Sequence, residues 1–447
     1  MEESNQNYLE KVKEFGGENK QKLLILGVVL LVASVLLAGV LFLGQDSNRN
    51  TNLNTVEGTV TIASDEPVPN PSTVIGESTG ATTEVIAYNQ DDEVVATAII
   101  NEEGEYSFET EEEQVDVVVN IEGVNTSEGE IYTAGRRSVV TDSTATVDFE
   151  FLGFESTEVN NTDVLVAYRH QTSNGASVKQ VGNLTQLQAI SSSDLYASYE
   201  LVRDIDAEDT KDWNYGSGFN PIGITDETVN GYNEYDFFQG EINGNGYTIS
   251  NLYVDRADRA GFIAKNRGTV VNLHFEDADM TTQDSTGPTG VVASVNQGAI
   301  RNVSVVDSVA VGNEVGLIAG LNKGSAEIDK NGVIDQVYAE GEVQGNNSVL
   351  QLGGIAGKST YTAQISNTQA NVTLPEPEED NPAINIGGVV GLVTDDGGLI
   401  TQNQYNEETA PNAVGSTYEF NGTITNNEAV PESELQNNTL TPIATGS

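Results

Sequence analysis

The chain of 447 residues contains no cysteine and only two histidines. The absence of cysteine excludes disulfides, thiolate metal sites and cysteine nucleophiles. His170 and His274 lie far apart in the sequence, and neither belongs to an H-E-x-x-H motif, so a zinc protease has no support. The sequence also lacks a G-x-x-x-x-G-K-[ST] motif, which argues against a P-loop nucleotide-binding protein.

Basic residues are scarce as well. The chain has 19 Lys and Arg against 68 Asp and Glu, which gives a formal net charge of -49. Because this charge repels phosphates, nucleic acid is excluded as a partner. The acidic residues are spread along the chain rather than gathered in one tail. Dispersed acidity suits a halophilic protein, since concentrated salt screens self-repulsion; a calcium-binding surface is the alternative.

One long hydrophobic run lies near the N-terminus. Residues 23–43 carry no charge, and as a helix they would span roughly 31 Å, about one hydrocarbon core. Lys20 and Lys22 directly precede the run, so the positive-inside rule predicts a single-pass protein of the cell membrane. Residues 1–22 would form a cytoplasmic stub and the rest an extracellular ectodomain. A cleaved signal peptide is the alternative.

The next part of the chain has the pattern of short strands. Residues 44–55 are polar and predict a flexible linker, whereas residues 56–152 contain about seven short strands without helical periodicity. Two of them, Thr83–Gln90 and Glu93–Ile100, flank an acidic turn and predict a hairpin. This spacing is typical of a small antiparallel β-sandwich. Residues 153–180 predict a polar connector with one strand, and Leu184–Ile190 a short helix.

The strand order in residues 56–152 carries a resemblance. Gly104, Tyr106 and Phe108 alternate after a strand that contains a V-x-A pattern. In this respect the segment resembles the carboxypeptidase regulatory-like, or transthyretin-like, domains of exported proteins. The resemblance implies a stalk that serves spacing or adhesion rather than chemistry.

Glycine-led apolar segments recur through the next region. They begin at Gly261, Gly290, Gly316, Gly353 and Gly387, with spacings of 29, 26, 37 and 34 residues. Units of this length cannot bury a hydrophobic face alone, so we expect them to stack as a solenoid. Two short strands per unit and no helical pattern favour a β-helix over residues 181–405, followed by a polar C-terminal segment at residues 406–447. Phe262, Val291, Leu317, Ile355 and Val389 are predicted to point inward.

The repeats also resemble a known family. Gly261–Ala264, Gly316–Gly320 and Gly388–Gly391 are similar to the GLUG repeat, and Phe238–Leu252 resembles the entry segment that precedes such repeats. Within that segment, Asn243–Gly246 predicts a tight turn. GLUG repeats occur in large surface and secreted proteins. The resemblance therefore implies surface display and contact with a glycan or protein partner, and it does not imply catalysis.

Two alternatives involve carboxylates. β-Helices often carry polysaccharide lyases or hydrolases, and Asp277 with Asp279, or Asp255 with Asp258, could pair; in so acidic a chain, solvated surface charge is the simpler interpretation. A carbohydrate-active enzyme therefore remains the alternative function. Separately, Glu327, Asp329, Asn331 and Asp335 have the oxygen spacing of a weak calcium loop, although Tyr338 occupies the place of its last acidic ligand.

The sequence thus predicts an all-β ectodomain with an N-terminal transmembrane helix, a small antiparallel β-sandwich, and a β-helix solenoid of GLUG-like repeats. The expected function is non-enzymatic adhesion, binding or structure at the cell surface. We assign no catalytic residue and no cofactor other than the calcium candidate.

Overall fold

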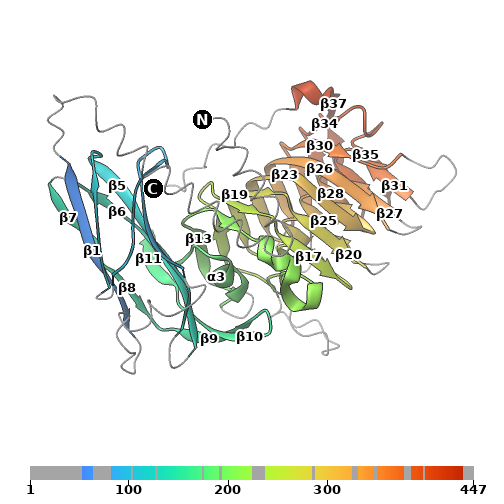
Figure 1. Ribbon diagram of the computed structural model, residues 1–447. Helices are drawn as coiled ribbons and strands as arrows, with labels where there is room; N and C mark the ends of the chain where they lie inside the picture. The colour runs from blue at the N-terminus through green and yellow to red at the C-terminus, as the bar shows by residue number, and fades with distance from the viewer. Residues whose placement is uncertain are drawn as a thin grey trace, which may run out of the picture. The chain divides into compact units, whose positions relative to one another are not determined.

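The computed structural model describes residues 53–63, 82–101, 104–125, 129–141, 143–173, 176–190, 194–223, 237–283, 287–324, 331–346, 350–376, 384–395 and 398–435. Residues 54–447 form one compact unit by their internal contacts. Within the described ranges the chain is almost entirely β-structure, which confirms the all-β prediction (Figure 1).

The membrane part of the predicted fold has to be corrected. No helix within the described ranges is long and apolar enough to cross a bilayer. The predicted span, residues 23–43, and the predicted stub, residues 1–22, lie outside those ranges. The transmembrane helix is therefore not supported, and the fold class is restricted to its all-β part.

Two sheets with a common core form the first part of the compact unit. The smaller sheet has β1 at its centre and contains β1 (Asn54–Ala63), β4 (Glu105–Thr110), β7 (Thr144–Thr146) and β8 (Phe149–Leu152). The larger sheet runs in the order β3 (Val94–Ala98), β2 (Thr82–Tyr88), β5 (Gln114–Asn125), β6 (Glu130–Val140), β10 (Thr162–Val166) and β9 (Glu155–Val159). We call these strands the sandwich.

Alternating side chains explain the sandwich core. In β4, Tyr106 and Phe108 are buried while their neighbours are exposed, as expected for a strand with one face on a core. They belong to a buried cluster with residues of both sheets, such as Val117 and Phe149. The predicted hairpin is confirmed: β2 and β3 pair antiparallel, and Asp92 in their turn is left-handed with φ 56°.

Residues 153–180 contain more structure than the single strand that the sequence predicted. β9 and β10 extend the larger sandwich sheet, and β11 (Arg169–Ser173) and β12 (Ala176–Val181) form an antiparallel hairpin. The helix α3 (Leu184–Ala189) follows and confirms the predicted short helix; Asn183 caps it by accepting a hydrogen bond from the Gln186 amide. Val159 and Val164 are buried in one core with Leu187 of this helix.

From β12 onward the strands pair in parallel and form a stack of coils, which we call the coil stack (residues 176–430). Its long sheet runs through β12, β13 (Ser198–Leu201), β14 (Ile205–Asp206), β15 (Glu241–Asn243), β16 (Thr248–Ser250), β17 (Tyr253–Arg256), β19 (Thr269–Glu276), β20 (Asp279–Thr282), β23 (Ala299–Gly312), β26 (Val333–Gly345), β29 (Gln364–Ser366), β30 (Gln369–Thr373), β33 (Leu399–Thr401), β34 (Gln404–Asn406), β36 (Thr423–Thr425) and β37 (Glu428–Val430).

Two shorter parallel sheets complete the coils. One contains β18 (Ile263–Asn266), β22 (Ala293–Asn296), β25 (Ala319–Lys323), β28 (Ala356–Thr360), β32 (Val390–Thr394) and β35 (Val414–Tyr418). The other contains β21 (Pro288–Thr289), β24 (Glu314–Gly316), β27 (Leu350–Gly353) and β31 (Ile384–Gly387). Two 3-10 segments, η2 (Glu208–Gly216) and η4 (Glu432–Glu434), also occur in the described part of the chain.

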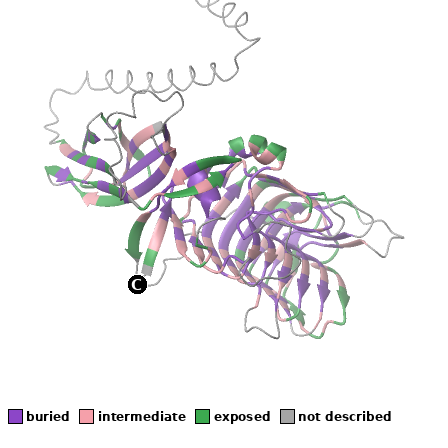
Figure 2. Cartoon of the chain, turned by 90° about the horizontal axis from the view of Figure 1, so that it is seen from below, coloured by how far each residue is buried: buried purple, intermediate pink, exposed green. Residues whose placement is uncertain are grey.

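Buried residues recur along the strands of successive coils (Figure 2). One column is fully buried and follows the strand register through Ile242, Val270, Ile300, Ile334, Ile365 and Ile400. The five residues predicted to point inward, which head the glycine-led segments, are also fully buried, so that prediction is confirmed.

The repeated glycines mark places where successive coils touch. A Cβ atom on Gly316 would lie 2.4 Å from Cα of Ala356, and one on Gly353 would lie 2.8 Å from the amide nitrogen of Gly391. These are backbone atoms that cannot move aside, so only glycine fits. The recurrent glycine in the sequence therefore reflects close backbone approach between coils rather than a positive φ.

Candidate binding surfaces

The predicted calcium loop lies only partly within the described residues. Glu327 and Asp329 fall outside them. The Asn331 side-chain oxygen accepts a hydrogen bond from the Thr362 hydroxyl, and Asp335 accepts bonds of 2.7 Å from Ser366 Oγ and Asn367 Nδ2. These oxygens thus bind the next coil, and the described residues contain no group of three or more metal-binding side chains. The calcium site stays a prediction.

The two histidines have structural partners. His274 is half-buried in β19, and its Nδ1 lies 2.5 Å from Ser304 Oγ on the next coil. Burial lowers the pKa of His274, so the ring is neutral at neutral pH. His170 Nδ1 lies 2.9 Å from Ser177 Oγ across the β11–β12 hairpin.

Four basic residues, Arg256, Arg259, Lys265 and Arg267, form a cluster in the first part of the coil stack. Arg259 forms an ion pair of 2.7 Å with Asp258, its neighbour in the sequence. Lys265 and Arg267 lie over the ring of Phe237, at 5.3 and 3.5 Å from its centroid. Cation–π contacts of this kind fix the basic side chains on an aromatic face. The cluster therefore stabilises the first coils rather than offering an evident anion site.

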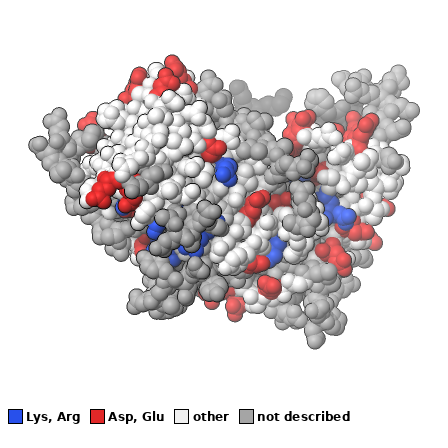
Figure 3. All heavy atoms as spheres, turned by 180° about the vertical axis from the view of Figure 1, so that it is seen from behind, with Lys and Arg blue, Asp and Glu red and all other residues white. Residues whose placement is uncertain are grey.

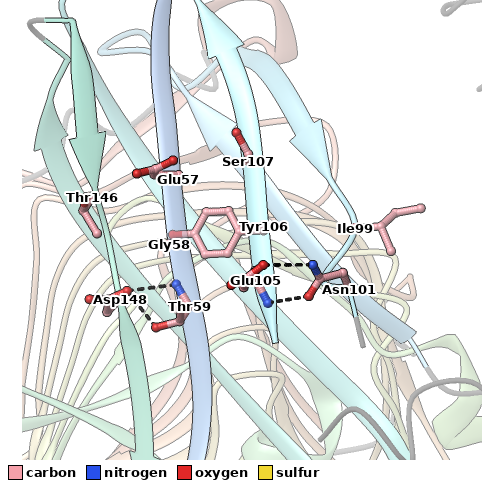
Figure 4. A pocket seen from close by; sticks show the side chains of 10 residues that line it. All are labelled: Glu57, Gly58, Thr59, Ile99, Asn101, Glu105, Tyr106, Ser107, Thr146 and Asp148. Carbon is pink, nitrogen blue, oxygen red and sulfur yellow. Dashed lines mark hydrogen bonds between the residues drawn. The ribbon is translucent and has the colours of Figure 1, made fainter. Parts of the chain in front are cut away.

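A hollow of about 450 Å³ opens on the sandwich (Figure 4). Asp148 in it accepts bonds of 2.9 and 2.8 Å from the amide and hydroxyl of Thr59, and these bonds lower the pKa of Asp148. Asn101 holds Glu105 in place through its side chain and the Glu105 amide. No Lys, Arg or His is among the described residues that line this hollow, so its polar groups are carboxylates, hydroxyls and an amide.

Two adjoining cavities of about 320 and 300 Å³ lie beside α3. They share Glu122, Leu184 and Asp209, and the first is also lined by Trp213, the only tryptophan of the chain. Burial raises the pKa of Glu122, while the bond of 2.6 Å from Asn120 Nδ2 and the charge of Arg203 lower it. The net shift is upward, so burial of this charge dominates.

Glu122 is expected to make the folding stability of the protein depend on pH. Because its pKa is higher in the folded than in the unfolded chain, stability is lost as pH rises from the unfolded pKa through the folded one. Glu122→Gln keeps an oxygen acceptor for Asn120 and removes the charge, so the melting temperature at pH 7 is expected to rise. Thermal unfolding between pH 4 and pH 8 at constant salt would check this. Glu208→Gln, which removes an exposed charge from the adjoining cavity, is the control; a lower melting temperature for Glu122→Gln alone would contradict the expectation.

Acidic side chains occur in many places on the surface. In Figure 3, Asp and Glu form several small groups on the visible face, and Lys and Arg are fewer. Ion pairs in the described residues neutralise only a few carboxylates, among them Glu84 by Arg203 and Glu314 by Lys358 at 3.7 Å. On the described surface, most carboxylates therefore have no basic partner.

Sequence reasoning missed two features. Asn214 and Tyr215 are consecutive left-handed residues, with φ 51° and 59°, and Tyr215 is 94% exposed. No motif marks such a pair in a sequence. Gly76–Gly80 reads GESTG, a G-x-S-x-G pattern that marks a nucleophile only on a strand–turn–helix. It lies outside the described residues.

Comparisons with known proteins give two similar sequences. The chain is 33% identical over 235 residues to halomucin of Haloquadratum walsbyi, which covers 50% of this chain and 2% of halomucin. It is 34% identical over 112 residues to a proposed Gly-rich membrane protein of Evansella cellulosilytica, which covers 24% of this chain and 12% of that protein. No protein-family model matches the chain.

Among solved structures, the chain is similar to a proposed immunoglobulin A1 protease from Bacteroides ovatus. The identity is 16%, the TM-score is 0.36, and the match covers 60% of this chain and 82% of that one.

Proposed function

We propose that this protein is a non-enzymatic surface protein of a salt-rich environment that binds a glycan or protein partner. The observation that carries the proposal is the similarity to halomucin over half of this chain. The name of that relative denotes a mucin of a salt-loving organism, and the name of the second relative refers to a membrane. Because the matches span small parts of both relatives, they support a surface setting and do not identify a partner.

The net charge agrees with this setting. With 68 acidic and 19 basic residues, the chain has a large excess of carboxylates and is expected to repel acidic polymers. Dispersed carboxylates keep a protein soluble in concentrated salt, where attraction between uncharged surfaces strengthens.

We also propose that the coil stack is a β-helix of the GLUG type. Gly316–Gly320 and Gly388–Gly391, two of the segments that resemble the repeat, lie around the starts of β25 and β32, two coils apart in the same sheet. A stack of this kind presents rows of outward side chains at the spacing of one coil, which suits contact with an extended partner.

The test is a binding screen with the full-length protein in molar salt. Immobilised glycans and whole cells are the probes, and release of reducing ends is measured in parallel. Binding to one class of glycan or cell without release of reducing ends supports the proposal. Depolymerisation that disappears on a single carboxylate substitution would overturn it in favour of a polysaccharide lyase or hydrolase.

A further inference from the structure

One corner of the coil stack is held by different side chains in its first coils and in its later coils. In the first coils, Asn266, Asn296 and Asn322 form a fully buried ladder, with side-chain bonds of 2.9 Å from each to the next. The oxygens of Asn266 and Asn296 also accept the amides of Gly268 and Gly298, which closes the chain tightly at this corner.

The ladder does not continue into the later coils. The strand register that aligns the three asparagines leads on to Ser359, Val393 and Thr417. None of these side chains carries the carboxamide group that forms the ladder. The corner that follows β28, β32 and β35 therefore lacks the buried asparagine ladder of the earlier coils.

The corner without the ladder has an unusual backbone. Tyr361, Asp395 and Glu419 stack above one another and are all left-handed, with φ 55°, 69° and 49°. Their coils are joined by bonds of 3.2 Å from the Tyr361 amide to Thr394 and from the Asp395 amide to Tyr418. A left-handed tyrosine is rare, and here it directs a large ring outward at the corner, where Tyr361 is 42% exposed.

These residues line a hollow of about 790 Å³. Its walls include Tyr361, Thr362, Asp395, Thr417, Glu419 and Phe420, and Tyr418 beside it is 64% exposed. Aromatic rings offer flat apolar faces, and the carboxylate and hydroxyl groups between them accept hydrogen bonds. The volume of this hollow falls within the range of ligand sites on proteins.

We propose that this corner, which we call the aromatic corner, binds a neutral polysaccharide. The C–H faces of sugar rings would pack on Tyr361 and Phe420, and sugar hydroxyls would donate to Asp395 and Glu419. Among the described residues, no Lys or Arg lines the hollow, so a uronate or sulfated chain would meet two carboxylates without a counter-charge. The inference rests on the proposed surface-binding function and specifies the chemical class of its partner.

The test uses Tyr361→Asn in the full-length protein. Asparagine tolerates a left-handed backbone, so this change removes the ring and spares the turn. Tyr215→Asn is a matched control, since Tyr215 is also left-handed (φ 59°) and exposed but lies in η2. Affinity for soluble mannan, β-glucan and xylan, and for alginate as the uronate, is measured by calorimetry in molar NaCl, with melting curves as the check of folding.

We expect binding to at least one neutral polysaccharide, no binding to alginate, and a loss of about tenfold in affinity for Tyr361→Asn with Tyr215→Asn unchanged. Equal affinity of Tyr361→Asn and the wild type, or a loss confined to Tyr215→Asn, would overturn the aromatic corner and leave the proposed function standing. Preference for alginate would overturn it as well. Absence of binding to every glycan and to cells would remove both the aromatic corner and the proposed function.

Discussion

Replacing Ile334 by aspartate is expected to abolish the cooperative fold of the coil stack. The Ile334 side chain is fully buried in the central column, between Ile300 on the preceding coil and Ile365 on the following one. A carboxylate there would lose its hydration without gaining a partner, at a cost that we put at about 5 kcal/mol or more. Because each coil is stabilised mainly by its neighbours, the damage should spread along the stack.

The measurement is thermal and denaturant unfolding in molar salt, followed by circular dichroism and gel filtration. Val333→Asp is the matched control: Val333 precedes Ile334 in β26, is half-buried, and points to the other face of the strand. Ile334→Val, which removes one methyl group, should cost about 1 kcal/mol. A melting curve of Ile334→Asp that coincides with those of the wild type and Val333→Asp would show that this column is not the core.

The interior of the coil stack could be predicted from the sequence because it repeats. Glycine followed by apolar residues, as at Phe262 and Leu317, marks a coil whose backbone touches the next one, and both side chains are fully buried. Single residues were equally informative where one side chain or one glycine determines where a helix starts or a turn forms. Asn183 begins α3, and Asn245 with Gly246 turns the chain between β15 and β16 at positive φ.

The number of sheets could not be predicted, because one strand of the third sheet of the coil stack is only two residues long. Pro288–Thr289 is too short to show an alternation of apolar and polar residues. It is a strand only because Glu314–Val315 pairs with it. Two asparagines bend the strands that contain them: Asn272 and Asn302 are left-handed within β19 and β23, at φ 53° and 51°. A single left-handed residue inside a strand leaves little trace in hydrophobic periodicity.

The aromatic corner was also beyond sequence reasoning. Tyr361, Asp395 and Glu419 are separated by 34 and 24 residues, and they meet only because of the coil-to-coil register. Insertions at corners change the length of each coil, so side chains that share a surface do not recur at a fixed interval. Exposure of an aromatic ring is likewise a property of the packed coils and not of the local sequence.

The protein is expected to lose its fold at low salt. Residues 1–43 hold five of the 68 acidic and four of the 19 basic residues, so 63 acidic residues face 15 basic ones in the remainder. In the described part, ion pairs such as Arg136 with Asp92 and Asp116 account for few of these carboxylates. The Debye length is about 3 Å in 1 M salt and about 10 Å in 0.1 M salt, so dilution restores repulsion between neighbouring carboxylates.

We therefore expect the melting temperature to fall steadily as NaCl is lowered from about 3 M to about 0.1 M, with loss of the strand signal in circular dichroism at the lower end. Millimolar CaCl₂ at low NaCl should restore part of the fold if divalent cations can replace screening. A sucrose series without salt is the control, because excluded solutes favour compact states without screening charge. If sucrose rescues the fold as well as NaCl does, screening is not the cause. A full strand signal and an unchanged melting temperature at 0.1 M NaCl would refute the salt dependence itself, and the acidity would then have to be explained by solubility alone.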